Sequence, residues 1–593
     1  MAWVLSPGDV AVWRDAPVEE LLDDASRPVR LPLTQSSQAM PLFSALSVES
    51  ASCDVTVDPA EQPQQHTFNV DSVLFAGGPV WSTAWCPLHN SEDATAGPLQ
   101  TVETLAVATH PKTQRRNPIG MQHTGPGIVQ LWGVPSSAES QLLTGGLPQL
   151  LTLLWHDGRV CWDLAWCPDP AAFVAVSSNS TGSSSAGGAA AAQQAVPLQG
   201  LLAAVLGNGD VVVWAVPTIA YLLEVAEEAG VGAAAAPQQQ QQQDVQQPLH
   251  PLSLQLSPLM QLPCSAVGGS MASCCSWLPA APHDQLLVGC WDGNVAIWQL
   301  PTTAGSSAQP IQLLRADPTP IHSVAWQPHK RWWLTGDTEE EAAAVLDGQS
   351  SSASSSGSAA SSSSAAHSCR YFLTASNIGN VRVWDAQDVL QPLHERVVSR
   401  NAINAALWMG PPHMVVVASA DGVLRQIWLD AGAQATTITT QVADVSGSCG
   451  SIWSIAGCEV LSVVAYVSDG GLLGVLPLEP PTGENRHRKS HAALSAVAVD
   501  DDQLWLLSAR EVPGNGGLYE NVPSWQGSHK KGKASEPPPS STVVLDPLPH
   551  PDQVLHSVSF SPNYRGSVSL AYGGGAGVVR VHTVSAEVVP TGM

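Results

Sequence analysis

The chain has 593 residues and a formal net charge of −26, with 24 Lys and Arg against 50 Asp and Glu. Nucleic-acid backbones are bound mainly through cationic side chains, so this charge argues against a stand-alone DNA- or RNA-binding protein and favours basic protein partners. Only 12% of the residues are charged, while Gly and Pro number 49 and 47, which favours a turn-rich, all-β chain over a mostly helical one.

The first 66 residues are predicted to form an N-terminal extension that is partly disordered. The opening stretch MAWVLSPGDVAVWRD has no basic segment and carries Asp9 early, so we do not expect a signal peptide. Within it, WVLSPGDVAVW (3–13) has the pattern of a short hairpin. No apolar run reaches the roughly 18 residues that a membrane span needs, so a soluble chain without membrane contact is expected.

A short apolar segment that ends in Trp or a related residue recurs from residue 79 onward. Its copies alternate apolar and small residues with period two, and most stop at Pro, which removes a donor from a strand ladder. The copies are PVWSTAWCP (79–87), VCWDLAWCP (160–168), CCSWLP (274–279), PIHSVAWQP (320–328), AINAALWM (402–409), GSIWSIAG (450–457) and LHSVSFSP (555–562). Each is predicted to be a short strand against a core, with Trp85, Trp166 and Trp326 buried.

A predicted hairpin follows each of these strands. It consists of an apolar strand, a turn of Gly, Asn or Asp, and a strand that often ends in Trp; Asn-Gly and Asp-Gly suit hairpin turns because they tolerate positive φ. The hairpins span 105–134, 201–217, 286–300, 371–388, 415–429, 462–478 and 569–584. A fourth strand fits before the next unit, for example at 149–156, 311–315 and 435–442.

Four strands per unit and seven units predict an all-β fold, a single seven-bladed WD-repeat-like β-propeller over residues 67–593, with helix below about 15%. TFNVDSVLF (67–75) is predicted to close the ring by completing the blade built by 555–584. We expect the repeated Trp residues to be structural wedges between blades: Trp85, Trp132, Trp166, Trp214, Trp298, Trp326, Trp384 and Trp428. Trp384-Asp385 is the one WD dipeptide in this set, and the Gly-His that opens a typical WD repeat is missing, which puts the usual Asp-His network in doubt.

Four segments interrupt the repeat and are predicted to be disordered insertions. They are 172–199, 225–249, 338–368 and 511–541, rich in Ser, Ala, Gly, Gln or Pro. None holds enough apolar surface to offset the entropy of ordering it.

No catalytic, cofactor-binding or metal-binding set is expected. The sequence lacks the GxSxG and HExxH motifs, and its 11 Cys include no CxxC pair, so we interpret them as reduced and mostly buried. GSHKKGKA (527–534) matches a phosphate-loop pattern, but Ala534 stands where a Ser or Thr would bind magnesium. This segment, KTQRR (112–116) and RHRK (486–489) are three separate basic clusters. Each could contact phosphate or serve in nuclear import, although a solvated loop is the simpler interpretation.

The order of these motifs resembles one family of propeller proteins. GGPVWSTAWCP followed by LAVATHP and GIVQLWGV, then WHDGRVCWDLAWCP and LLAAVLGNGDVVVWAVP, is similar to the WD-repeat subunit of RNA polymerase III transcription factor IIIC. LLVGCWDGNVAIWQLP, GSIWSIAG and LAYGGGAGVVRVH continue the resemblance, which covers about residues 72–584.

The resemblance implies a nuclear, non-catalytic scaffold that supports recognition of internal tRNA-gene promoters. It also implies contacts with other subunits of that factor, including a second propeller. The basic N-terminal tail of some family members is missing here, so DNA contact is expected to be indirect or weak.

Two other functions remain open. The chain could be a WD-repeat scaffold of another assembly, such as a ubiquitin-ligase adaptor or a ribosome-assembly factor. The chain could also be an enzyme, since some propellers are catalytic. No catalytic set of residues is visible in the sequence, so this alternative is the weakest, and no small-molecule substrate or cofactor is expected.

Overall fold

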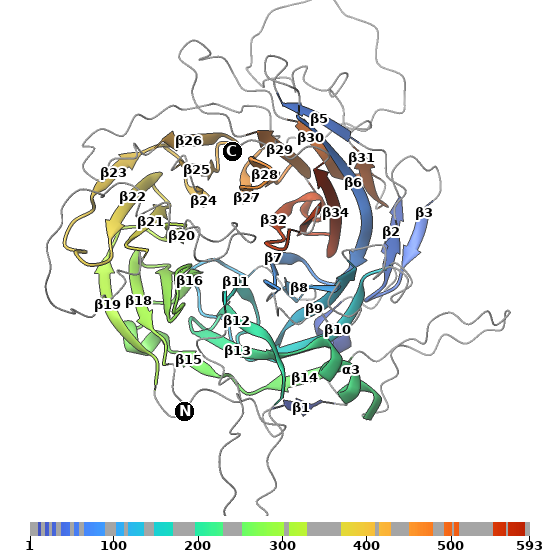
Figure 1. The fold of residues 1–593 in the computed structure, drawn as a ribbon, viewed down its shortest axis with the longest axis horizontal. Coiled ribbons are helices and arrows are strands. Elements are labelled where there is room, and N and C mark those ends of the chain that lie inside the picture. The colour runs from blue at the N-terminus through green and yellow to red at the C-terminus, as the bar shows by residue number, and fades with distance from the viewer. Residues whose placement is uncertain are drawn as a thin grey trace, which may run out of the picture.

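The chain folds as a β-propeller in this computed structural model (Figure 1). Structural statements below concern the residues that the structure describes. These are 10–13, 18–22, 27–30, 37–47, 53–57, 64–88, 102–111, 117–135, 147–169, 196–228, 252–301, 307–328, 369–409, 414–428, 450–477, 492–500, 503–508, 550–564 and 567–586.

Seven sheets surround a common axis, and each is named here by its innermost strand. The innermost strands are β7 (Val80–Trp85), β11 (Cys161–Trp166), β16 (Ala272–Trp277), β20 (Ile321–Trp326), β24 (Ile403–Met409), β27 (Ile452–Cys458) and β32 (Leu555–Phe560). Each contacts the next in this order, and β32 contacts β7, so the innermost strands form a closed ring (Figure 1).

Each innermost strand pairs with a hairpin, as the sequence predicted. The second strands are β8 (Val102–Thr109), β12 (Leu198–Leu206), β17 (Gln285–Cys290), β21 (Tyr371–Ser376), β25 (Met414–Ser419), β28 (Val463–Ser468) and β33 (Ser567–Gly574). The third strands are β9 (Gly127–Pro135), β13 (Val211–Pro217), β18 (Asn294–Gln299), β22 (Asn380–Asp385), β26 (Leu424–Trp428), β29 (Leu472–Pro477) and β34 (Val578–Ala586). Gly293 shows why the turns need Gly: it has φ 91°, and a Cβ there would lie 2.0 Å from the Asp317 carbonyl oxygen.

A fourth strand completes six of the seven sheets. These strands are β10 (Gln149–His156), β15 (Met260–Leu262), β19 (Gln309–Arg315), β23 (His394–Val397), β30 (Ala492–Asp500) and, on the β32 sheet, β6 (Gln64–Phe75). The β24 sheet has three strands, so the described residues contain six four-stranded blades where the sequence predicted seven. The strand predicted at 435–442 for the β24 sheet lies outside the described residues.

The ring closes through β6, and the strand predicted for this role is confirmed. β6 lies antiparallel to β34, with Phe75 opposite Val578 and His66 opposite Ala586. The first and last parts of the propeller therefore share one sheet.

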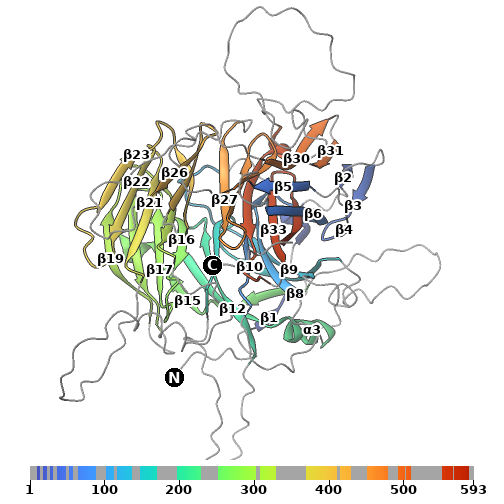
Figure 2. The same ribbon diagram turned by 45° about the horizontal axis from the view of Figure 1, so that its top comes forward.

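The N-terminal residues form further strands on the outer edges of three sheets instead of a separate unit. β1 (Val10–Val12) pairs with β14 (Ser253–Leu256), which extends the β7 sheet beyond β10. Most of the hairpin predicted over 3–13 lies outside the described residues; its described part, β1, pairs with a distant strand. β2 (Arg27–Arg30) and β3 (Ser37–Met40) extend the β27 sheet beyond β31 (Gln503–Ser508), and β4 (Ala45–Ser47) and β5 (Cys53–Val57) pair with β6 (Figure 2).

Described helices are few and short. They are α1 (Val18–Leu21), α3 (Ile219–Glu228) and two 3₁₀ turns, η4 (Cys264–Val267) and η5 (Pro551–Gln553). Two predicted insertions need shorter bounds, because residues 198–199 belong to β12 and residues 225–228 belong to α3. The remaining parts of these two insertions, 172–197 and 229–249, lie outside the described residues except for residues 196–197. The insertions 338–368 and 511–541 also lie outside them, and so do the basic clusters 112–116, 486–489 and 527–534.

Candidate functional site

Every innermost strand carries a β-bulge at its second residue. The pairing with the second strand skips that residue, and a bulge of this kind re-aims the side chain it leaves unpaired. The bulged residues are Trp81, Trp162, Ser273, His322, Asn404, Trp453 and His556. Because the innermost strands surround the axis, these seven residues lie at one end of it, which we call the axial mouth.

Six aromatic or imidazole side chains form an arc at the axial mouth. We call this set the aromatic collar, and in order around the axis it consists of Trp453, His556, Trp81, Trp162, Trp291 and His322. Five of them are bulged residues, and Trp291 follows β17 in the neighbouring turn. Apart from Trp162, which is buried, each keeps part of its surface exposed, whereas core residues next to them such as Val80 and Ile321 are fully buried.

Trp81 is the centre of the collar. Its ring centroid lies 5.1 Å from that of His110, in a stacked arrangement, and 4.6 Å from that of His556. Trp162 and Trp453 meet it edge to face, at 5.5 Å and 5.9 Å. One Trp side chain thus joins the β7, β11, β27 and β32 sheets.

Burial keeps the imidazoles of the collar, and that of His110 stacked on Trp81, neutral. Desolvation lowers the pKa of His556 to about 4, lowers that of His110 to about 3, and lowers that of His322 below its ordinary value. His556 Nδ1 donates to the Val80 carbonyl at 3.3 Å, and His322 Nε2 donates to Asn377 Oδ1 at 3.1 Å. A neutral imidazole has one donor and one acceptor nitrogen, so the other nitrogen of each ring is an acceptor.

A polar layer next to the collar ties the sheets together. Asp163 on β11 accepts hydrogen bonds from the backbone amide of Cys275 on β16 at 3.0 Å and from that of Leu164 at 2.9 Å, and Ser82 Oγ lies 3.5 Å away. Burial raises the pKa of the Asp163 carboxyl to about 6. Equivalent bonds to Ser hydroxyls join other sheets: Thr83 N to Ser557, Ala406 N to Ser323 and Val558 N to Ser454.

Replacing Asp163 with Ala is expected to lower the free energy of unfolding by about 3 kcal/mol, because two buried amides lose their acceptor at about 1–3 kcal/mol each. Asp163→Asn is the matched control, since its amide oxygen can still accept one bond, and we expect about half of that loss. Urea unfolding at pH 7 measures both. Equal unfolding midpoints for Asp163→Ala and the native chain would show that this layer does not hold the sheets together.

The repeated Trp residues lie inside the sheets and between them. Trp85, Trp166 and Trp326 end β7, β11 and β20 and are buried, as expected. Four third-strand Trp residues are paired across the sheet with an apolar residue of the second strand. The pairs are Leu105 with Trp132, Leu202 with Trp214, Leu286 with Trp298, and Phe372 with Trp384. These four are also buried, while Trp428 ends β26 and its side chain lies outside the described residues.

Three of the Trp residues that end innermost strands donate their indole N–H to the preceding sheet. Trp85 Nε1 donates to the Ser559 carbonyl at 3.2 Å, and Trp166 Nε1 donates to the Ala84 carbonyl at 3.1 Å. Trp277 repeats this contact with the Ala165 carbonyl at 2.9 Å. Trp277 was not among the eight predicted Trp residues, although it lies within the quoted segment CCSWLP.

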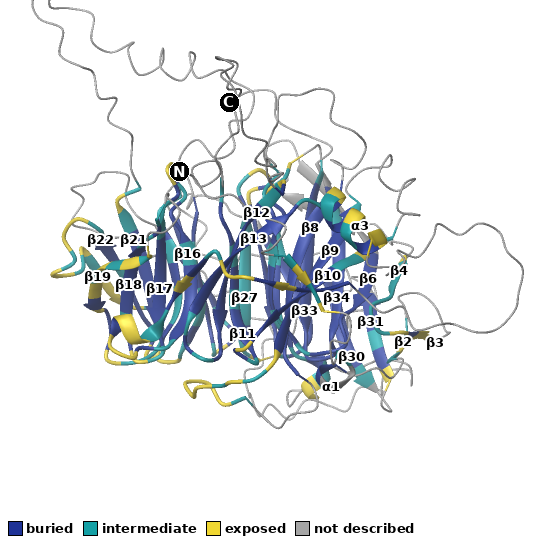
Figure 3. Cartoon of the chain, turned by 90° about the horizontal axis from the view of Figure 1, so that it is seen from below, coloured by how far each residue is buried: buried dark blue, intermediate teal, exposed yellow. Residues whose placement is uncertain are grey.

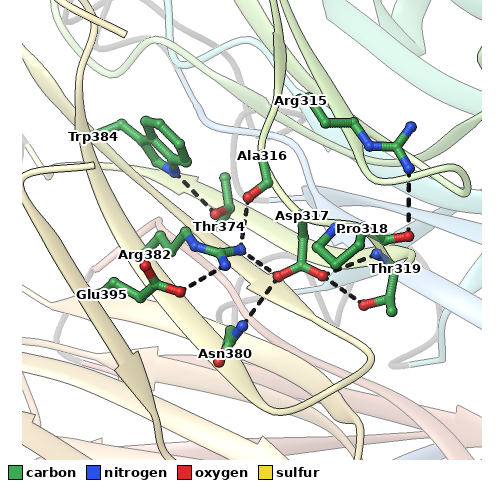
Figure 4. Close-up of polar contacts among 10 residues, drawn as sticks. All are labelled: Arg315, Ala316, Asp317, Pro318, Thr319, Thr374, Asn380, Arg382, Trp384 and Glu395. Atoms are coloured by element: carbon green, nitrogen blue, oxygen red, sulfur yellow. Dashed lines mark hydrogen bonds and ion pairs between the residues drawn. The ribbon is translucent and has the colours of Figure 1, made fainter. Parts of the chain in front are cut away.

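Asp317, in the turn before β20, is the centre of a polar network, and no His is among the residues that Figure 4 draws for it. Asp317 accepts hydrogen bonds from Thr319 N at 2.9 Å and Thr319 Oγ1 at 2.7 Å, and it forms an ion pair with Arg382. Arg382 also pairs with Glu395 at 2.7 Å. Burial alone would raise the pKa of Asp317, but these hydrogen bonds hold it below its ordinary value. The network stabilises the turn between β19 and β20, where the sequence gave reason to doubt an Asp-His network.

An exposed apolar patch lies on the outer edge of two neighbouring sheets. We call it the rim patch, and it consists of Ile311, Leu313, Leu390, Leu393 and Val397. Leu390 is 93% exposed and Val397 65%. The patch follows β19 and β23, which are the outermost strands of their sheets. Figure 3 shows exposed residues around β19. Where exposed apolar side chains are contiguous, they mark protein-interaction surfaces.

The sequence analysis missed the collar as a site. Its signal was present in the quoted segments: Trp81, Trp162, His322, Trp453 and His556 occupy the second position of five repeated strands. The described residues contain no group of three or more His, Cys, Asp or Glu placed to hold a metal ion. None of their helices is long and apolar enough to cross a membrane.

The comparison with curated proteins agrees with the family resemblance. The chain is similar to general transcription factor 3C polypeptide 2 of Homo sapiens and of Pongo abelii, with 22% identity over 567 residues in each case. The alignments cover 89% of this chain and 54% of each relative, so the chain spans about half the length of the curated relatives it matches. No family model matches the chain.

Proposed function

We propose that this chain, like the general transcription factor that it resembles, acts in transcription, as a non-catalytic scaffold subunit of a transcription factor IIIC complex in the nucleus. The observation that carries the proposal is the similarity over 89% of the chain to two relatives of the same name. In this role the chain would support recognition of internal promoters of tRNA and related genes through contacts with other subunits, including a second propeller.

We further propose that the β24 sheet is the seventh blade of the propeller. Its three strands have the same order and the same bulge as the other sheets, and β24 contacts β20 and β27. Residues 429–449, which follow β26, are long enough to supply a fourth strand.

Two surfaces support a scaffold role. The rim patch offers apolar side chains at the outer edge, and the aromatic collar offers partly exposed Trp rings at the axial mouth. Trp is enriched among the residues that dominate binding energy at protein interfaces. These surfaces lie at the periphery and at the axis, so two partners could be held at once.

The charge of the chain supports indirect DNA contact. The three basic clusters of the sequence hold three Lys or Arg each, against a net charge of −26. One such cluster, fully engaged with phosphates, would give a log–log dependence of affinity on salt with a slope of only about −2 to −3.

The test combines affinity purification from nuclear extract with a mobility-shift titration on tRNA-gene DNA at about 150 mM salt. We expect transcription factor IIIC subunits to co-purify, and we expect sequence-specific DNA binding only when they are present. Nanomolar specific binding by the isolated chain would contradict the scaffold role. Co-purification of a different assembly would instead favour the alternative, a WD-repeat adaptor or ribosome-assembly scaffold.

A further inference from the structure

The aromatic arc of the collar is open at the β24 sheet, where the bulged residue is Asn404. Asn404 lies between the two ends of the arc, because β24 contacts both β20, which carries His322, and β27, which carries Trp453. Its Nδ2 donates to the Ile452 carbonyl at 2.8 Å, which fixes the amide and leaves Oδ1 as an acceptor. Asn404 is partly exposed.

The Trp residues nearest the two ends of this gap have no stacked partner among the described residues. Trp453 meets Trp81 at an interplanar angle of 62° and His556 at 82°. Trp291 meets Trp162 at 77° and His322 at 82°. Trp81 differs, since its ring is stacked on His110. The gap is therefore bordered by Trp453 at one end and by His322, with Trp291 behind it, at the other, and both indole rings make edge contacts.

The groups at the gap are acceptors and π surfaces. Asn404 offers Oδ1, and the neutral ring of His322 offers Nδ1 because its Nε2 donates to Asn377. The cation–π contacts within the described residues lie elsewhere: Arg30 with Trp505, Arg370 with Tyr371, and Arg580 with Tyr572. The collar rings are thus not engaged by any cation of the described chain.

We propose that the axial mouth binds one cationic side chain, Arg or Lys, at the gap between Trp453 and His322, with Asn404 and His322 accepting its N–H groups. A cation over an indole face is attracted by the negative charge of the ring face, and the N–H groups of Arg and Lys match the two acceptors. The net charge of −26 favours the approach of a basic segment. This inference rests on the proposed scaffold function, because the side chain would be presented by a protein partner.

Calorimetric titration of the full chain with short peptides at about 150 mM salt tests the inference. The peptides share one sequence and differ at one central residue, which is Arg, Lys or the neutral Arg isostere citrulline. We expect the Arg and Lys peptides to bind at least about five-fold more tightly than the citrulline peptide, the range of one cation–π contact with its hydrogen bonds. Equal affinity of the three peptides would overturn the proposal.

Variants locate the site. Trp453→Ala and Asn404→Leu are each expected to weaken binding of the Arg peptide at least about three-fold. Trp13→Ala, which removes the Trp that follows β1 at the outer edge of a sheet, is expected to leave it unchanged. Thermal melts show whether each variant is folded. If the peptide were held only by the overall negative charge of the chain, Asn404→Leu would bind it as tightly as the native chain does. An unchanged affinity in Asn404→Leu would therefore also contradict the proposed site. If the chain co-purifies with transcription factor IIIC but does not prefer the Arg peptide, the site fails and the proposed function stands; the reverse pattern removes the function and keeps the site.

Discussion

Deletion of residues 1–75 is expected to abolish cooperative unfolding of the propeller, because it removes β6. This strand pairs with β34 over nine residues and closes the ring. Its residues Val73, Leu74 and Phe75 are fully buried. Burying such side chains contributes about 1.5–3 kcal/mol each, so their loss alone approaches the 5–15 kcal/mol by which a typical domain is stable.

The position of β6 between two cores explains why its loss should act on the whole ring. Val73 and Phe75 pack in the core shared by the β27 and β32 sheets, whereas Leu74 packs with Trp85 and Trp132 of the β7 sheet. Without β6 the β32 sheet loses the strand through which the N-terminal part of the chain joins it. Leu74→Ala is a milder version of the same test and is expected to cost about 2–5 kcal/mol.

The matched control is deletion of residues 1–13, which removes β1. This strand pairs with β14 over three residues at an outer edge, so we expect a loss of about 1–2 kcal/mol and a cooperative transition. Urea unfolding followed by near-ultraviolet circular dichroism compares the three variants. A cooperative transition with an unchanged midpoint after deletion of 1–75 would show that closure by β6 is dispensable.

Acid is expected to destabilise the propeller strongly below about pH 6.5 through its buried His residues, of which His110 and His156 have the most strongly lowered pKa values. Burial lowers the pKa of His110 to about 3 and that of His156 to about 3. His110 Nε2 donates to the Cys161 carbonyl at 3.0 Å, a bond that either form of the ring can make, whereas His156 Nδ1 accepts from the Gly158 amide at 3.2 Å, which requires the neutral ring. Protonation of His156 Nδ1 would break the second of these bonds.

The direction of the effect follows from proton binding. Below about pH 6.5 the unfolded chain binds a proton at each imidazole, while the folded chain does not do so until near pH 3. The stability that these residues contribute is therefore complete above pH 6.5 and is lost as the pH falls, at about 1.4 kcal/mol per residue per pH unit. Asp163 opposes this trend between about pH 6 and 4, because its pKa is raised and its folded form gains a proton first.

Urea unfolding between pH 7 and 4.5 measures the slope of stability against pH. In His110→Gln we expect the slope to be shallower than in the native chain by about 1.4 kcal/mol per pH unit, and in the double variant with His156→Gln by about twice that. His394→Gln on the outer strand β23 is the control and should keep the native slope. A double variant with the native slope would contradict the assignment of acid sensitivity to these residues.

The strands, their turns and the buried Trp residues were predictable from local patterns. Alternation with period two located β7, β11 and β20, and Asp-Gly placed the turns at which Gly293 and Gly422 have positive φ. The bounds of the insertions were less accurate. Residues 198–199 and 225–228 have compositions close to those of the neighbouring low-complexity tracts, yet β12 pairs with β13 and α3 has a buried apolar face.

The collar was not predictable, for a geometric reason. Regular alternation assigns Trp81 and Trp162 to one face of a strand, but a bulge at each position re-aims the side chain toward the axis. The sequence shows aromatic residues at equivalent places in several repeats, but it does not show the bulge. It also does not show that the repeats surround one axis, which alone brings residues from β7 and β27 into ring contact.

The sequence by itself determined the repeat, the strand order within each sheet and the Trp positions, because these depend on contacts between residues close in the chain. Only the tertiary structure decided the partners of β1 and β2, the outermost positions of β19 and β23 in their sheets, and the place of Asn404 between the two ends of the collar. These features depend on contacts between distant segments, such as Val10 with Leu256 and Val29 with Leu504. Such contacts form only once ring closure has offset the entropy of bringing those segments together, and no local pattern encodes that balance.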